Sequence, residues 1–237
     1  MRFVSVRDLR GKSSEIWRRV GAEKDLVVTS NGHPIAILSA VSEDSLEESL
    51  AAIRQARAAQ AVEFMQRASV ASGRDRLPQA DDRRGDTGRS PRPRAMRTVL
   101  DTNVLVCGLL KPYGAPGEIV RMVASGVLRV CHDARILAEY QEVLQRPKFR
   151  FRPSDVDALL DGIRSNGLAV SAIPLSRRLS DPDDEMFLEV ALAAAVRHLI
   201  TGNLSDYAGH THRPVQVISP SRFIAWHRAH AEEATGL

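Results

Sequence analysis

Acidic side chains in the second half of the chain have the types and positions that could do chemistry. Asp101 follows a strand-forming apolar pair and precedes an apolar helical pattern, so it lies where a strand gives way to a helix. Taken alone, Asp101 is equally consistent with a simple helix N-cap. Three further carboxylates would come from separate elements: Glu139 within a predicted helix, and Asp183 and Asp184 at the start of another. The pattern predicts an acidic site wherever the fold brings these elements together.

The elements that must position these carboxylates alternate between strand and helix from Arg97 to Ala231. Strands are expected at 127–131 and 169–173, and helices at 117–125, 134–145 and 153–166. This alternation indicates an α/β fold with a mainly parallel sheet flanked by helices, and Asp101, Glu139 and Asp184 would converge at its carboxyl edge. Two carboxylates about 4 Å apart repel by roughly 4 kcal/mol at an effective dielectric near 20, so the site needs a cation. Hard oxygen ligands favour Mg²⁺ or Mn²⁺ over zinc.

The bulk composition is that of a soluble globular protein. The 237 residues are 43% hydrophobic and 26% charged, which leaves room for one large domain or two small ones. The sequence contains neither an apolar run of membrane-spanning length nor the apolar core of a signal peptide, so we expect a cytoplasmic protein with no membrane partner. Cys107 and Cys131 lack metal-ligand spacing and are expected to be reduced core residues. Residues 73–95 supply +3 of the net charge of +4, so basicity alone does not indicate a folded nucleic-acid-binding domain.

A small α+β unit is expected over residues 1–45. Apolar positions from Val6 to Val20 keep to one helical face. Two β-rich runs, 25–30 and 33–40, then flank Asn31-Gly32, which is a strong hairpin signal. After Ser45 the pattern changes to a long amphipathic helix, whose apolar stripe has no partner within the small unit and should therefore pack on something else.

Four motifs occur in order between residues 96 and 230: LDTNV, ILAEY, DPDDEMFLEVA and LITGN. This segment resembles the PIN-domain ribonucleases, the toxin half of many bacterial toxin-antitoxin pairs. The resemblance implies that Asp101, Glu139 and Asp184 are catalytic and bind metal. A fourth family acid often lies where this chain has Asn203, so either Asp206 substitutes as a metal ligand or one metal binds weakly. The polar residues expected to support the site are Asn103, Thr201 and Asn203.

The chemistry implied is Mg²⁺- or Mn²⁺-assisted hydrolysis of RNA phosphodiesters. One ion lowers the pKa of a bound water, and a second, if present, stabilises the leaving oxygen, so the products carry a 3′-hydroxyl and a 5′-phosphate. Whether one or two metals bind stays open. Aspartate-nucleophile phosphatases also place an Asp after a strand, but they need a second Asp two residues later, where this chain has Asn103.

Residues 1–72 resemble the Phd/YefM antitoxins, whose pattern is a short strand, a helix, a hairpin of the VVTSNGHPIAIL kind and a helical tail. The resemblance implies that the head, residues 1–45, forms a homodimer or higher oligomer and binds operator DNA to repress its own operon. Ser30 stands where a basic residue is common before the turn. The residues assigned to DNA binding are Arg7, Arg10 and Lys12.

The helical tail, residues 46–72, would then clasp the nuclease, residues 96–237, across a disordered basic linker at 73–95. The chain is thus expected to be a fused antitoxin and toxin, with one of Arg67, Arg74 and Arg76 entering the acidic pocket. Clasping within one chain or between two chains stays open. The alternative is a DNA-binding autorepressor whose nuclease is permanently inhibited or inactive. The residues assigned to inhibition are Leu46, Leu50, Ile53, Arg67 and Arg74.

Overall fold

The computed structural model describes residues 2–23, 25–73, 96–176, 178–207 and 214–235; for residues 23 and 231–235 it describes only the backbone. The chain divides into two compact units, Met1–Leu50 and Ala51–Leu237. The predicted linker lies outside the described residues except for Gly73. None of the helices in the described part of the chain is long and apolar enough to cross a membrane.

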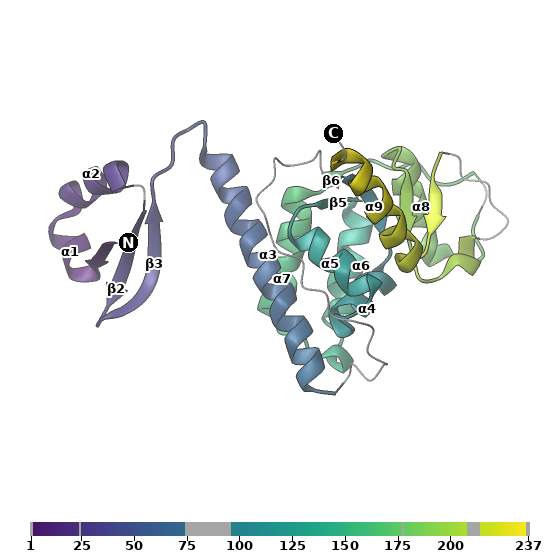
Figure 1. The fold of residues 1–237 in the computed structure, drawn as a ribbon, viewed down its shortest axis with the longest axis horizontal. Coiled ribbons are helices and arrows are strands. Elements are labelled where there is room, and N and C mark those ends of the chain that lie inside the picture. Colours follow the sequence, from purple (N-terminus) through teal and green to yellow (C-terminus); the bar gives the residue numbers. More distant parts are fainter. Residues whose placement is uncertain (1, 24, 74–95, 177, 208–213, 236–237) are drawn as a thin grey trace. The chain divides into compact units, whose positions relative to one another are not determined.

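The first unit is a three-stranded sheet with two short helices (Figure 1). Its elements are β1 (Arg2–Ser5), α1 (Val6–Gly11), α2 (Ser13–Glu23), β2 (Asp25–Ser30) and β3 (His33–Ser39). The central strand β2 pairs in parallel with β1 and antiparallel with β3. The buried side chains that hold it together are few: Val4, Ile16, Val20 and Leu26.

The hairpin between β2 and β3 forms as predicted, because Asn31 and Gly32 adopt φ values of 51° and 80°, the left-handed pair that a tight two-residue turn requires. The single helical face expected from Val6 to Val20 is wrong in one respect, since the helix breaks at Lys12, where φ is −130° and ψ is 34°. The carbonyl of Lys12 then accepts the N–H groups of Glu15 and Ile16, at 3.1 and 3.0 Å, and starts the second helix.

Helix α3 (Leu46–Ala71) crosses from the first unit into the second, to which its residues from Ala51 onward belong. The prediction that its apolar stripe is buried is wrong for several residues, because Leu46, Ile53 and Phe64 are 41%, 46% and 43% exposed. Ala61 and Met65 of the predicted stripe are buried, and they share the inward face with Val62 and with small and polar residues that allow close helix contact. The buried positions are Ala58, Ala61, Val62, Met65, Gln66 and Ser69.

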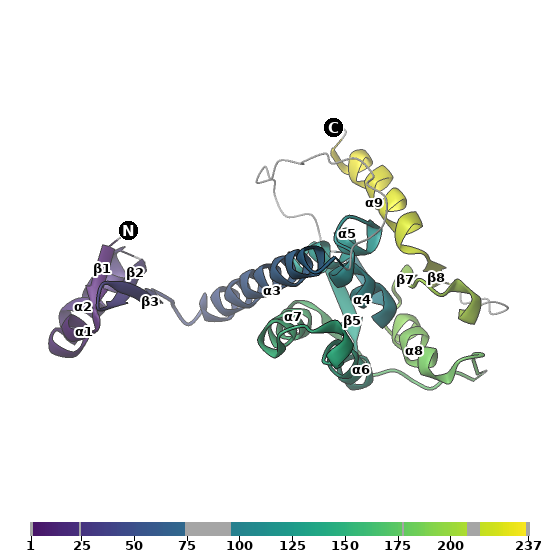
Figure 2. The same cartoon turned by 90° about the horizontal axis from the view of Figure 1, so that it is seen from below.

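The second unit is built on a five-stranded parallel sheet in the order β6-β5-β4-β7-β8, so the predicted mainly parallel sheet is confirmed. Helices flank this sheet (Figure 2). The elements are β4 (Met96–Leu100), α4 (Thr102–Leu110), α5 (Ala115–Ala124), β5 (Leu128–His132), α6 (Ala134–Leu144), η1 (Pro147–Phe149), α7 (Pro153–Asn166), β6 (Leu168–Ala169), η2 (Pro182–Asp184), α8 (Glu185–Ala193), β7 (His198–Ile200), η3 (Leu204–Tyr207), β8 (Gln216–Ile218) and α9 (Pro220–Thr235).

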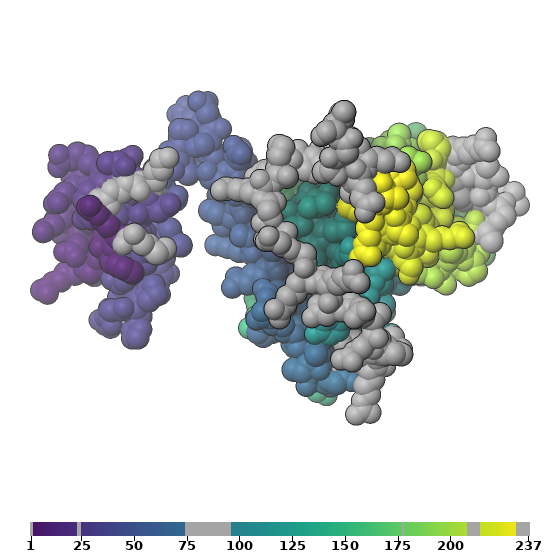
Figure 3. All heavy atoms as spheres, in the orientation of Figure 1, coloured from purple at the N-terminus to yellow at the C-terminus, as the bar shows by residue number. Residues whose placement is uncertain are grey.

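The core of this unit lies between the sheet and its helices, and it includes fully buried residues of β4, β5 and β7. Helix α8 packs across these three strands, while α9 contacts α5 and forms part of the outer surface in the space-filling view of Figure 3. Cys107 and Cys131 are both free, and Cys131 is fully buried. The predicted strand at 169–173 shrinks to β6: the N–H of Val170 still donates to the carbonyl of His132, whereas the N–H of Leu175 donates to Glu189 of α8.

The strand order reverses at β4, because β5 and β6 follow on one side and β7 and β8 on the other. Such a reversal leaves a crevice at the carboxyl ends of the two strands that flank it. Leu100 pairs with Ile200 at these ends. The residues that come next, Asp101 and Thr201, are therefore neighbours across the crevice.

Candidate active site

Asp101 is the fixed point of the site. It is 4% exposed and caps α4, with its Oδ1 accepting the N–H of Asn103 at 2.9 Å. Its Oδ2 accepts two side-chain hydrogen bonds, from Thr201 Oγ1 at 2.6 Å and from Asn103 Nδ2 at 2.8 Å. Asp101 is thus both a helix cap and a buried carboxylate at the sheet edge.

The three predicted supporting residues lie together around this carboxylate. Asn103 Oδ1 accepts the N–H of Gly202 at 3.1 Å, and Thr201 Oγ1 accepts the N–H of Asn203 at 2.9 Å. These bonds tie the loop after β7 to the first turn of α4. The loop therefore fixes the side chains of Thr201 and Asn103, which donate hydrogen bonds to Asp101.

Glu139 reaches the same edge from the middle of α6. Its Oε1 accepts a hydrogen bond of 2.5 Å from Thr102 Oγ1. The next residue, Tyr140, is fully buried, and its hydroxyl donates to the backbone carbonyl of Leu100. Thr102 and Tyr140 were not predicted as site residues, although Thr102 lies inside the LDTNV motif; together they join α6 to the end of β4.

Asp184 and Asp206 come from two short 3₁₀ helices on the other side of Asp101. Asp184 ends η2 and directly precedes α8, while Asp206 lies in η3 and accepts a hydrogen bond from the amide of Asn203. The hydroxyl of Tyr207 donates to the backbone carbonyl of Asp184 at 3.5 Å. Tyr207, another residue that the sequence pattern did not single out, thereby links η3 to η2.

The carboxylates raise the pKa of one another. Burial, followed by the charges of Asp101, Asp181 and Asp206, raises the pKa of Asp184 to about 7. Burial also raises the pKa of Asp101 and of Glu139, against hydrogen bonds that lower them, and nearby carboxylates add to both shifts. The exposed Asp183 contributes only as one of the charges that act on Glu139. The structure thus brings the predicted Asp101, Glu139, Asp184 and Asp206 close enough for their charges to act on the pKa of neighbouring carboxylates.

This donor set fits a hard divalent cation. Each ionised carboxylate raises the pKa of its neighbours, and Mg²⁺ or Mn²⁺ would neutralise this negative charge. Oxygen atoms are the ligands that these ions prefer. Within the described residues, no three His, Cys, Asp or Glu side chains stand close enough together to hold a metal ion as they are. The residues that would hold the ion are Asp101, Glu139, Asp184 and Asp206.

The fold and this acidic edge define a parallel α/β domain with a carboxylate site at its topological switch point. Residues 97–205 match the family model described as "PIN domain", a span of less than half the chain that runs from β4 into η3. PIN domains are in general metal-dependent nucleases, many of them toxins of toxin-antitoxin systems. Neither the curated proteins nor the solved structures give a match to the chain. The match does not extend to the first unit, so the Phd/YefM resemblance stays a prediction.

The residues predicted to inhibit the site do not meet the carboxylates where they are described. Leu46 and Ile53 are exposed, Leu50 is half-buried, and Arg67 pairs with Glu63 on the solvent side of α3. Arg74 lies outside the described residues. The described Arg67 pairs with Glu63 on its own helix, and the entry of one of Arg67, Arg74 and Arg76 into the acidic pocket stays a prediction.

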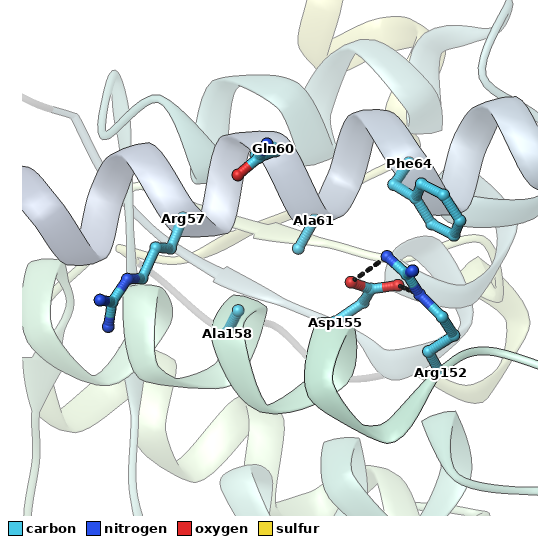
Figure 4. Close-up of a pocket in the computed structure, with 7 residues that line it drawn as sticks. All are labelled: Arg57, Gln60, Ala61, Phe64, Arg152, Asp155 and Ala158. Carbon is cyan, nitrogen blue, oxygen red and sulfur yellow. Dashed lines mark hydrogen bonds and ion pairs between the residues drawn. The ribbon is translucent and has the colours of Figure 1, made fainter. Parts of the chain in front are cut away.

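A hollow between α3 and α7 is shown in Figure 4. Arg152 forms two hydrogen bonds with Asp155, at 2.7 and 2.9 Å, and its Cζ lies 3.5 Å from the centroid of the Phe64 ring. None of the predicted catalytic carboxylates lines this hollow. It lies between α3 and α7, within the second unit.

Proposed function

We propose that residues 96–237 are a Mg²⁺-dependent endoribonuclease. The observation that carries the proposal is the convergence of Asp101, Glu139, Asp184 and Asp206, from four separate elements, at the switch point of a PIN fold. When bound, the ion would lower the pKa of a water and neutralise charge on the phosphate. The chain's own part is to hold Asp101 through Thr201 and Asn103, and Glu139 through Thr102, so that the ligands are oriented before the substrate arrives.

The proposed function also includes a tethered antitoxin segment, and α3 supports it. Gln66 is 5% exposed, and its Nε2 donates to the carbonyl of Gly108 at 2.8 Å and to that of Gly117 at 3.4 Å. Arg121 Nη1 donates to Gln66 Oε1 at 3.3 Å and to the carbonyl of Pro112 at 2.8 Å. The buried face of α3 and the hydrogen bonds of Gln66 hold this helix on the fold, as a clasping segment requires.

The close approach of α3 is specific to glycines on the nuclease. A Cβ atom at Gly162 would lie 2.5 Å from the Cβ of Ala58, and one at Gly126 would lie 2.9 Å from the amide of Gln55. Among the described residues, α3 contacts α4 and α5 through Gln66, and α7 through Ala58. Arg67, Arg74 and Arg76 are the candidates for the arginine that blocks the carboxylates.

The first unit is proposed to bind operator DNA as a dimer. Arg7, Arg10 and Lys12 are all exposed along and just after α1. The open face of the sheet carries Phe3 and Ile37, exposed by 62% and 65% on either side of Val27 in the pairing register. A unit of about 50 residues buries too little apolar surface to be stable by itself, so a second copy is the natural cover for this face.

The test of the nuclease compares RNA cleavage, with Mg²⁺, by the full chain and by the full chain carrying Met65→Glu. Met65 is 1% exposed, so a charge there should undock α3 and release cleavage. Adding Asp101→Asn should abolish the released cleavage, whereas Asp157→Asn, which alters an exposed carboxylate on α7, should leave it unchanged. Cleavage that survives Asp101→Asn would refute the assignment. A chain that starts at Met96 is a weaker test, because it lacks α3 and exposes the groove that Ala61, Val62 and Met65 fill.

The test of the first unit is separate. Arg10→Ala should weaken a mobility shift with operator DNA and lower its salt dependence by about one unit of slope, because one phosphate contact is lost. Ile37→Asp should abolish dimerisation in sedimentation. A monomeric parent would count against the proposed dimer.

A further inference from the structure

One proposed metal ligand, Glu139, lies on α6 and another, Asp184, directly precedes α8, and a partly buried ion pair joins these two helices. Arg135 Nη1 lies 2.7 Å from Glu189 Oε2, and the Glu189 side chain is 4% exposed. Arg135 is in the first turn of α6, four residues before Glu139, and Glu189 is in α8, five residues after Asp184. Residues four apart lie one above the other on a helix face. Arg135 therefore lies one turn from Glu139 on the same face of α6, whereas Glu189 lies about one and a half turns after Asp184.

The arginine is itself held in place by the cap of α6. Asp133 Oδ1 accepts the N–H groups of Arg135 and Ile136 at 2.9 and 3.0 Å, and its Oδ2 accepts Arg135 Nε at 2.8 Å. The same aspartate thus fixes the start of the helix and the direction of the guanidinium. The planar guanidinium of Arg135 therefore bridges Asp133 on one side and Glu189 on the other.

The second oxygen of Glu189 holds the segment that leads into Asp184. Its Oε1 accepts the backbone N–H of Leu175 at 3.0 Å. One turn earlier on α8, Glu185 repeats the arrangement: its Oε1 accepts the N–H of Leu179 at 3.0 Å, and its Oε2 pairs with Arg178 at 3.1 Å. Two buried glutamates therefore fasten Leu175, Arg178 and Leu179 to α8, shortly before the turn that carries Asp184.

Neither glutamate is explained by packing. A buried carboxylate is costly unless its oxygens are paired, and an apolar side chain would fill the same space without that cost. What an apolar side chain would lack is the simultaneous hold on α6 and on the segment before η2. Those two elements, with α8 between them, deliver Glu139 and Asp184.

We propose that Arg135 and Glu189 form a positioning pair that sets the separation of the Glu139 and Asp184 carboxylates, with Asp133 orienting the arginine and the N–H of Leu175 the glutamate. This inference rests on the proposed nuclease function. The pair does not touch the substrate. It acts by fixing the distance between α6 and α8 at the end where the metal would bind.

The experiment uses the full chain with three substitutions. Glu189→Gln keeps an acceptor for Leu175 but removes the ion pair; Arg135→Met removes the pair from the other side; Arg135→Lys keeps the charge without the fork. The matched control is Arg164→Met, which removes an exposed pair with Asp161, 2.7 Å apart within α7. Mn²⁺ affinity is measured by calorimetry, and amide hydrogen exchange is followed along the chain.

Glu189→Gln and Arg135→Met should each weaken Mn²⁺ binding about tenfold or more and raise exchange at 175–184 and in the first turn of α6. The exchange of β4 and β7 should stay at the parental level, Arg135→Lys should recover part of the loss, and the control should match the parent. Parental Mn²⁺ affinity in Glu189→Gln, or a rise in exchange spread evenly over the core, would overturn the positioning role. A parent that neither binds Mn²⁺ nor yields cleavage on release of α3 would instead refute the nuclease, and the exchange pattern would still decide whether the pair fixes α6 to α8.

Discussion

Thr201 donates a hydrogen bond of 2.6 Å to Asp101 across the carboxyl ends of two paired parallel strands, β7 and β4. The same hydroxyl accepts the N–H of Asn203, so it has both a donor and an acceptor role. This bond favours the ionised form of Asp101, against the burial that raises its pKa. Thr201, together with Asn103, therefore favours the ionised carboxylate that the proposed cation would bind.

Thr201→Val should raise the pKa of Asp101 further and reduce cleavage about tenfold at neutral pH, because a hydrogen bond to a charged group contributes about 1.5 to 3 kcal/mol. The loss should grow as the pH falls, since more Asp101 is then protonated. Thr201→Ser keeps the hydroxyl and is the matched control. A pH profile of cleavage in the released nuclease tests this, and equal profiles for the two variants would contradict it.

The position of this bond could be read in large part from the sequence. Asp101 follows an apolar strand pattern, and LITGN is a strand that runs into a polar loop, so parallel pairing places both at one edge. Thr102 and Tyr140 adjoin predicted residues, but their bonds to Glu139 and to the carbonyl of Leu100 depend on how α6 lies on the sheet. Periodicity along one helix does not determine that packing.

The buried face of α3 is hard to predict from the sequence, because several of its side chains do not distinguish a buried helix face from an exposed one. Ala58, Ala61 and Ser69 are as common on exposed helices as at tight contacts, whereas the exposed Ile53 and Phe64 look like core residues. Gly126 and Gly162, the glycines that admit Gln55 and Ala58, lie 71 and 104 residues after these partners in the chain. The pair of Arg135 and Glu189 is likewise separated by 54 residues, so no local pattern indicates it.

Mg²⁺ should stabilise the nuclease more at pH 8 than at pH 5.5. The pKa of Asp184 is raised from 3.8 to about 7, so between these values the folded state holds a proton that the unfolded state has lost. Stability therefore falls as the pH rises through this window, and the full repulsion is present above it. A bound cation relieves that repulsion, and at low pH it must first displace the proton.

Thermal unfolding with and without Mg²⁺ at the two pH values measures this effect. Asp184→Asn should reduce both the pH dependence of the melting temperature and its response to Mg²⁺, while Asp157→Asn should behave as the parent. An equal Mg²⁺ shift at both pH values would contradict the proposed cation site.

Acid should destabilise the second unit through His198. This histidine is 1% exposed, its Nε2 has no hydrogen-bond partner among the described residues, and its ring centroid lies 4.3 Å from that of Trp226. Burial, with a smaller effect of Arg197, lowers its pKa from 6.5 to about 4. Between pH 6.5 and pH 4, His198 binds a proton in the unfolded chain but not in the folded chain. The free energy of unfolding therefore falls as the pH falls.

A shift of this size corresponds to a loss of about 3 kcal/mol across the window. His198→Gln, which stays neutral, should flatten this part of the pH dependence in denaturant unfolding, and the exposed His33→Gln should not. An unchanged slope in His198→Gln would show that another group is responsible.

The strongest test of the contact between α3 and the nuclease is Gln66→Leu. Gly108 lies in the last turn of α4, where backbone carbonyls have no partner within the helix, and the amide of Gln66 supplies that partner at 2.8 Å. Leucine has a similar size but no donor, so the buried carbonyl of Gly108 would be left unsatisfied at a cost of about 1 to 3 kcal/mol. That cost falls only on the docked state, because water satisfies the carbonyl when α3 leaves.

Gln66→Leu should therefore increase hydrogen exchange along residues 58–69 by about tenfold or more and raise RNA cleavage, while leaving exchange in β4 and β7 unchanged. The matched control is Gln60→Leu, an exposed glutamine on the same helix, which should change neither. If Gln66→Leu protects α3 as well as Gln60→Leu does, the glutamine does not hold the helix on the nuclease; if exchange rises but cleavage does not, α3 binds the nuclease without inhibiting it.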